Sequence, residues 1–242
     1  MKAIILSAGQ GRRLMPLTSN LAKCCLPLHG ISILEWQLSQ IAQCDIEEVI
    51  VVTGFASEMV DAIVDKVQGI NVRTFHNPMY AHTDNLGTCW EARFEMDGPF
   101  VLMNGDTLFE AAVLQRLLAA DKKYPITLAT DTKAHFDLDD MKIIADGDRV
   151  LKVSKLLDIR LVSAESIGLM TFNASGAESF TIKLEEMMDK ADALGLWYLS
   201  AIDQLASESI VGICPIDGMS WCEVDDAADF VAAADVVQQW QR

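Results

Sequence analysis

The chain has 242 residues, of which 51% are hydrophobic, and a formal net charge of −16 at pH 7. This length predicts one substantial core, as a single domain or a domain with a small appended part. The acidic charge argues against a nucleic-acid partner, and no apolar run approaches the roughly 20 residues that span a bilayer. We therefore expect neither a nucleic acid nor a membrane as a partner.

The six cysteines lack Cys-x-x-Cys spacing, and two of them, Cys24 and Cys25, are adjacent, which is a poor geometry for an ordinary disulfide. The opening residues have the pattern of a strand rather than of a signal peptide. Both observations predict reduced thiols and a cytoplasmic location.

Apolar runs that predict strands alternate with segments of helical periodicity, which is typical of a parallel sheet flanked by helices. The first half predicts strands at 2–6, 48–53, 72–75, 100–103 and 126–130 and helices at 31–41, 56–67, 86–96 and 111–121. The second half predicts a hairpin at 142–150 that turns at Asp146-Gly147. It then predicts strands at 150–156, 166–172, 211–213 and 221–225, and helices at 174–191, 196–207 and 227–239. We predict an α/β fold with a doubly wound, mostly parallel sheet and a small mixed subdomain. The chain would form one domain whose two parts meet near residue 135: a nucleotide-binding part before it and an acceptor-binding part after it.

A glycine loop follows the first strand directly. Gly9 and Gly11 allow backbone N–H groups to close on an anion, and Arg12, Arg13 and Lys23 add positive charge. The third glycine of the dinucleotide fingerprint and the Gly-Lys-Ser/Thr of a P-loop are both absent, so neither motif applies. A strand that leads into a glycine loop with cations is suited to a nucleoside triphosphate.

The full pattern at residues 6–28, L-S-A-G-Q-G-R-R-L-x-P-L-T-x4-K-x2-L-P-L, resembles the signature of the nucleotidyltransferases that activate sugar 1-phosphates and similar phosphate monoesters. Ala22 and Arg12 depart from that signature without removing a catalytic group. The resemblance implies a Rossmann-like fold, Arg13 on the leaving phosphates, and Lys23 on the α-phosphate or the incoming phosphate. The nucleotide contacts that we expect are Leu6, Ser7, Ala8, Gly9, Gly11, Arg12, Arg13, Lys23, Gly54, Asn85, Gly87, Thr88 and Gly105.

Carboxylates follow two of the predicted strands. Asp106 lies at the carboxyl end of a buried strand, where ligands of parallel sheets bind, although Asn-Gly-Asp is also a common turn. The resemblance makes Asp106 a ligand of Mg²⁺, and the segment from Trp221 to Asp225 resembles the second acidic motif of the family. Glu223 and Asp225 would share a face of one strand, so we expect Asp225 to bind the metal and Glu223 to bind it or to lie beside it.

Two further acids, Asp226 and Asp229, are expected to cap the following helix.

Three segments resemble the phosphocholine cytidylyltransferase-like branch: Asp139-Asp-Met-Lys142, Ser154-Lys155 and Glu165-Ser-Ile-Gly168. This likeness implies CTP as the nucleotide. Most lysines lie on the solvated surface and most aromatic residues lie in the core. The likeness to this branch nevertheless makes the lysines and aromatic residues named below candidates for the acceptor site. The acceptor contacts that we expect are Lys142, Lys155, Glu165, Gly168, Trp197 and Tyr198, the two aromatic residues being able to contact a quaternary ammonium.

The sequence thus predicts a Mg²⁺-dependent cytidylyltransferase that acts on a small phosphate or phosphonate monoester and releases pyrophosphate. Leu86-Gly87-Thr88 resembles the sugar-nucleotide branch, so a hexose 1-phosphate enzyme that uses UTP, dTTP or GTP is the alternative. An inactive regulatory homologue is a third reading, against which the joint presence of Lys23, Asp106 and Asp225 argues. A homodimer is an assembly that the sequence leaves open.

Overall fold

The computed structural model describes residues 1–242, and the chain folds into two units. Unit 1 comprises residues 1–81, 103–115 and 219–242, and unit 2 comprises residues 82–102 and 116–218. The division differs from the one expected near residue 135, because residues 219–242 belong with the N-terminal segment. No helix of the structure is both long enough and apolar enough to cross a membrane.

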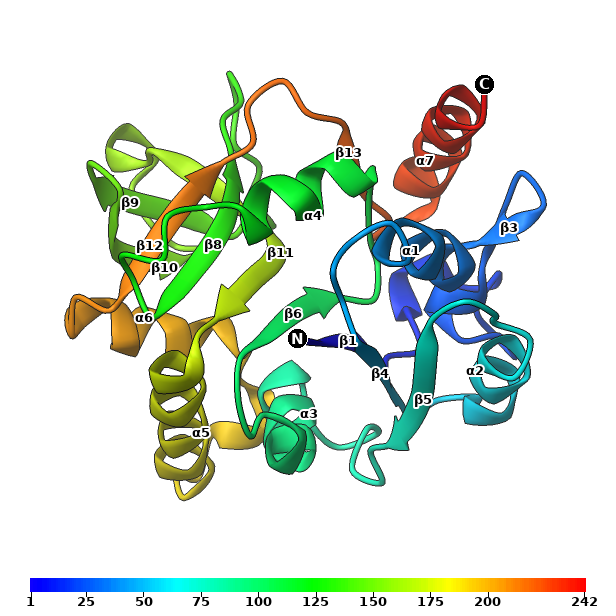
Figure 1. Cartoon of the computed structure of the whole chain (residues 1–242), viewed down its shortest axis with the longest axis horizontal. Coiled ribbons are helices and arrows are strands. Elements are labelled where there is room, and N and C mark those ends of the chain that lie inside the picture. Colours follow the sequence, from blue (N-terminus) through cyan, green and yellow to red (C-terminus); the bar gives the residue numbers. More distant parts are fainter. The chain divides into compact units, whose positions relative to one another are not determined.

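Three parallel strands form the sheet of unit 1 in the order β5-β4-β1 (Figure 1). They are β1 (Lys2–Ser7), β4 (Glu48–Thr53) and β5 (Asn71–His76). The buried apolar residues of β1 and β4 explain the continuous hydrophobic runs of the sequence, whereas β5 has no fully buried residue. Ser7 is paired with Thr53, and Thr53 with His76, so the carboxyl ends of the three strands meet at one edge.

Unit 1 contains further helices and two short strand pairs. Its helices are α1 (Ile33–Ile41), α2 (Ser57–Val64) and α7 (Ala227–Trp240), and its 3-10 helices are η1 (Arg12–Leu14) and η2 (Lys23–Cys25). Two small antiparallel pairs join β2 (Pro27–Leu28) to β3 (Ile31–Ser32) and β7 (Thr107–Phe109) to β13 (Trp221–Glu223). β2, β3 and β7 are not predictable from the sequence, because segments of two or three residues carry no detectable periodicity.

A hydrophobic cluster connects three distant parts of unit 1. Its buried members include Leu14 of η1, Trp36 of α1, Leu108 of β7, Val224 between β13 and α7, and Val237 of α7. The ring of Trp36 also stacks on that of Trp240, with ring centroids 5.3 Å apart. This packing fixes residues on either side of Val224 relative to the glycine loop.

Unit 2 contains five strands in the order β11-β8-β12-β10-β9, and β11 also pairs with β9, so that the strands close into a ring. They are β8 (Ile126–Asp131), β9 (Lys142–Asp146), β10 (Arg149–Ser154), β11 (Ala164–Phe172) and β12 (Val211–Pro215). β8 and β12 run parallel, whereas the pairings of β10 with β9 and of β11 with β8 are antiparallel. The predicted hairpin is present, but its turn lies one residue later than expected, at Gly147-Asp148, because Asp146 still belongs to β9 and pairs with Arg149. Gly147 has a φ of 61°.

The helices of unit 2 are α3 (Asn85–Glu91), α5 (Ala174–Met188) and α6 (Leu199–Ser207), with 3-10 turns η3 (Ala92–Glu95), η4 (Ile159–Leu161) and η5 (Ala193–Gly195). The chain passes between the units through β6 (Phe100–Asn104) and α4 (Ala111–Leu118). The α/β class is confirmed. The helix predicted at 86–96 ends earlier, because its last turn is a 3-10 helix.

Candidate active site

The glycine loop is held from within by its own side chains. Thr18 is fully buried, and its Oγ1 donates to the carbonyl oxygen of Gly11 at 2.8 Å, while Gln10 Nε2 donates to Thr18 O at 3.3 Å. Gly11 has a φ of 73°, a left-handed conformation that favours glycine. Leu14 anchors the loop in the core, and Arg12 and Arg13 are exposed.

The turn after β6 packs directly against the end of β1. A Cβ at Gly105 would lie 2.5 Å from Ser7 Oγ and 2.6 Å from Leu6 O, and the N–H of Gly105 donates to Leu6 O at 3.0 Å. Only glycine allows this approach. In contrast, a Cβ at Gly9 would meet no heavy atom within 4 Å, which leaves its face of the loop open for a ligand.

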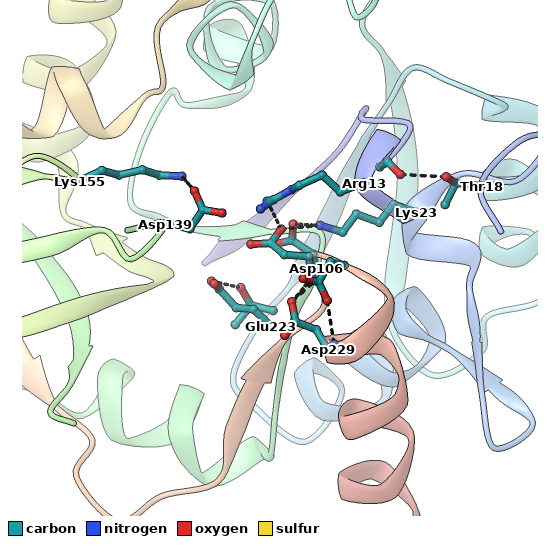
Figure 2. A network of polar contacts seen from close by, with 12 residues as sticks. Arg13, Thr18, Lys23, Asp106, Asp139, Lys155, Glu223 and Asp229 are labelled. Atoms are coloured by element: carbon teal, nitrogen blue, oxygen red, sulfur yellow. Dashed lines mark hydrogen bonds and ion pairs between the residues drawn. The ribbon is translucent and has the colours of Figure 1, made fainter. Parts of the chain in front are cut away.

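A lysine and two carboxylates that are distant in sequence meet beside the loop. Lys23 Nζ lies 2.5 Å from Asp106 Oδ2 and 2.9 Å from Asp225 Oδ1, and Arg13 Nη2 lies 2.9 Å from the same oxygen of Asp225. The two carboxylate oxygens that Lys23 contacts are therefore at most about 5.4 Å apart, the sum of its two distances. Figure 2 shows Lys23 and Arg13 reaching this group from the glycine-loop side.

The two carboxylates keep Lys23 charged in spite of its burial. Burial lowers the pKa of this ammonium, but the charges and hydrogen bonds of Asp106 and Asp225 raise the pKa by more, so the net shift is upward. The side chain of Lys23 is 14% exposed, compared with 25% and 30% for the two carboxylates. A positive charge thus lies between the two acids that the sequence analysis expects to bind Mg²⁺.

The donor set fits a magnesium ion. Asp106 Oδ1 is buried and has no hydrogen-bond partner, which is costly for a carboxylate oxygen unless a cation completes it. The protein forms no group of three or more potential metal-ligating side chains. Magnesium commonly takes only one or two protein carboxylates and completes its shell with substrate phosphates and water, so two acids suffice.

Glu223 contacts the residue next to Asp106, and its metal role remains a prediction. Its Oε1 accepts from Thr107 Oγ1 at 3.4 Å, in register with the pairing of β13 with β7. β13 ends at Glu223, so Asp225 lies beyond the strand, and the argument that both acids share one strand face is wrong.

The backbone at Asp225 is held by the start of α7. Asp226 and Asp229 form a capping box, as expected, in which Asp226 accepts from the N–H groups of Ala228 and Asp229. Asp229 Oδ2 also accepts from the N–H of Asp225 at 3.0 Å. The cap of α7 therefore orients the residue that contacts Lys23.

Lys142, in unit 2, has a different role from the one expected. It is 4% exposed, and its Nζ donates to the carbonyl oxygens of Asp137, Asp140 (3.3 Å) and Lys155 (3.1 Å). These three contacts use all three ammonium protons. The structure therefore assigns Lys142 to holding the 137–140 loop against residue 155, in place of the expected phosphate contact.

Glu165 belongs to an ionic group that was not predicted from the sequence, in which the two carboxylates are largely buried and the lysine is about one-third exposed. Lys133 Nζ lies 3.1 Å from Glu165 Oε2 and 2.8 Å from Asp140 Oδ2. Burial raises the pKa of Glu165 to about 7, and the Lys133 charge offsets only part of that effect. No sequence pattern predicts this role of Lys133, because its contacts with Asp140 and with Glu165 of β11 form only in the folded chain.

Of the remaining residues expected to contact the acceptor, Trp197 is exposed, whereas Tyr198 and Gly168 are buried. Trp197 is 41% exposed, and Lys155 Nζ lies 4.2 Å from the centroid of its ring and 3.5 Å from Asp139 Oδ1. Tyr198 is fully buried, so its ring cannot contact an acceptor in this structure, which corrects that expectation. Gly168 is buried within β11, where its φ of 71° coincides with a break in the strand register.

Three of the expected nucleotide contacts lie at the start of α3 in unit 2. Asn85 Oδ1 accepts from the N–H of Tyr198 at 2.8 Å, and a Cβ at Gly87 would lie 2.6 Å from the Cβ of Thr83. Thr88 is 5% exposed. These contacts account for Asn85 and Gly87 by local packing, while their nucleotide roles remain predictions.

The open glycine loop and the lysine between two carboxylates thus lie together in unit 1. The chain belongs to the nucleotidyl transferase family, which matches it at residues 2–136. The CMP-5'-(3-aminopropyl)phosphonate synthase of Streptomyces rubellomurinus is 30% identical over 95% of this chain, which spans 37% of that protein. The choline-phosphate cytidylyltransferase of Streptococcus pneumoniae is 26% identical over 95% of both chains.

Solved structures are similar over the whole chain. The inositol-1-phosphate CTP transferase from T. maritima matches with a TM-score of 0.83, covering 98% of this chain and 94% of the other, at 16% identity. At this identity the likeness shows the fold alone.

Proposed function

We propose that the protein is a Mg²⁺-dependent cytidylyltransferase that transfers CMP from CTP to a small phosphate or phosphonate monoester and releases pyrophosphate. The observation that carries the proposal is the group of Lys23, Asp106 and Asp225, with the unsatisfied buried oxygen of Asp106. The two curated relatives support CTP and this class of acceptor. The six free thiols support a cytoplasmic location.

The reaction joins two anionic reactants. An acceptor oxygen forms a bond to the α-phosphorus, and the bond from that phosphorus to the pyrophosphate oxygen breaks. Lys23, Arg13 and the loop amides would neutralise phosphate charge and hold the reactants in line. Asp106 and Asp225 would hold Mg²⁺, which supplies further charge neutralisation when bound.

The acceptor would bind to unit 2, where Lys155 and the exposed face of Trp197 combine a positive charge with an aromatic surface. Lys142 and Glu165 would shape this region through the loop that they hold.

Pyrophosphate release tests the proposal. The protein is incubated with Mg²⁺, each of CTP, UTP, dTTP, GTP and ATP, and a panel of phosphate and phosphonate monoesters. We expect release with CTP and an acceptor. Release only with UTP, dTTP or GTP and a hexose 1-phosphate would favour the alternative, and nucleotide binding without any release would favour an inactive homologue.

Substitution of the two carboxylates tests the metal assignment. Asp106→Asn and Asp225→Asn should each lower kcat by at least about 100-fold, because metal-held charge stabilisation contributes several kcal/mol. The double variant should be little worse than either single one, since the two acids act as a unit. Asp65→Asn, at an exposed position after α2, is the matched control and should keep wild-type kcat. Additive losses in the double variant would contradict a shared ion.

A further inference from the structure

Gln37 is a glutamine in the core of unit 1, at the centre of α1, and its side chain is 0% exposed. Its Nε2 donates to the carbonyl oxygens of Asn104 and Thr107, each at 2.8 Å. Both neighbours are acceptors, so the nitrogen of the amide must face them. These two carbonyls stand on either side of Gly105 and Asp106, and a single side chain therefore closes the turn that carries the carboxylate.

Burial of the Gln37 amide costs free energy of folding. Gln37 Oε1 has no hydrogen-bond partner, and an unsatisfied buried polar atom costs free energy that an apolar residue would avoid. An apolar residue of the same volume, such as methionine, would fill the space. The benefit of glutamine thus comes from the two bonds to the turn.

The direction of α1 makes these bonds possible. The Ser32–Glu35 capping box fixes the start of the helix, and Trp36 Nε1 donates to Phe109 O at 2.9 Å. One turn after Gln37, Gln40 Oε1 accepts from the N–H of Ala111 at 2.9 Å. α1 thereby holds the whole stretch from 104 to 111, and Gln37 is the residue that contacts the turn.

The turn has backbone contacts as well. The N–H of Gly105 donates to Leu6 O at 3.0 Å, and the N–H of Val224 donates to Asp106 O at 3.2 Å. The backbone on and beside Asp106 is thus attached to β1 through Gly105, to the segment before Asp225 through Asp106 itself, and to α1 through the contacts of Gln37 with Asn104 and Thr107. This attachment from three directions restricts where its carboxylate can lie.

We propose that Gln37 is a positioning residue that holds Asp106 in the orientation required to bind the divalent metal. This inference rests on the proposed function, because it assigns the purpose of the turn to the metal. Partners that orient a metal ligand typically contribute 10- to 100-fold to metal affinity.

The test compares Gln37→Met with Gln40→Met. Both replace a buried or nearly buried glutamine of α1 by an apolar residue of similar length, but only the first removes bonds to the Asp106 turn. Mn²⁺ binding in the presence of CTP is measured by electron paramagnetic resonance, CTP binding without metal by calorimetry, and the melting temperature in parallel. Gln37→Asn, which keeps the amide but shortens its reach, replaces Gln37→Met if the latter does not fold.

We expect Gln37→Met to weaken Mn²⁺ binding by about 10- to 100-fold. Metal-free CTP affinity should stay at the wild-type value, and Gln40→Met should bind Mn²⁺ like the wild type even if its melting temperature falls. Wild-type Mn²⁺ affinity in a destabilised Gln37→Met variant would overturn the inference alone. A wild-type protein that binds no Mn²⁺ with CTP would overturn the proposed function and the inference together.

Discussion

Lys23→Met removes the ammonium between Asp106 and Asp225 while preserving most of the length and volume of the side chain. The two carboxylate oxygens, at most about 5.4 Å apart, then face each other without that charge. At this separation two unit charges repel by about 3 kcal/mol at an effective dielectric constant of about 20. Arg13 still contacts Asp225, and both acids are partly exposed, so we expect a loss of about 2–3 kcal/mol.

A loss of that size should lower the melting temperature by roughly 5–10 °C in a chain of this length. Thermal unfolding is measured in chelator and in saturating Mg²⁺. The ion should stabilise Lys23→Met more than the wild type, because in the variant it replaces a missing positive charge. Lys66→Met, at an exposed position, is the control. A variant as stable as the wild type in chelator, or equal Mg²⁺ stabilisation in both proteins, would refute the reasoning.

Two further predictions concern unit 2. Because the pKa of Glu165 is raised to about 7, the folded protein retains a proton between about pH 4.5 and pH 7 that the unfolded chain loses. The free energy of unfolding should therefore fall by up to about 3 kcal/mol as pH rises through this window. Urea unfolding at several pH values measures this fall, which Glu165→Gln should reduce. An equal pH dependence in the variant and the wild type would contradict the raised pKa of Glu165. Lys142→Met should cost about 2–4 kcal/mol of stability, because three carbonyls lose their donor. Lys155→Met should instead raise the acceptor KM several-fold at wild-type stability, and the reverse pattern would show that the two roles are exchanged.

Long apolar runs made the fold predictable. The strand at 48–53 was predicted with its observed bounds, because parallel strands buried on both faces need continuous apolar residues. Asp225 could be named from its motif, but its place beyond β13 could not, since a three-residue strand leaves too short a pattern to locate its end.

Side-chain burial was the harder part. Lys142 has the sequence context of a phosphate ligand, yet a folded loop surrounds its ammonium with carbonyls that no local pattern reveals. Tyr198 was expected to be available to a ligand because aromatic residues serve both cores and binding sites. Gln37 carries no local signal, because its partners are backbone atoms 67 and 70 positions further along the chain.

The sequence separation of the charged group has a consequence for biosynthesis. Lys23 is 83 positions from Asp106 but 202 from Asp225, so a growing chain can form the first ion pair long before the second. Until Asp225 emerges from the ribosome and α7 packs on Trp36, the glycine loop has one of its two acids. We expect the nascent chain to acquire the complete carboxylate pair in a later step than the first ion pair, as a single event linked to the docking of α7.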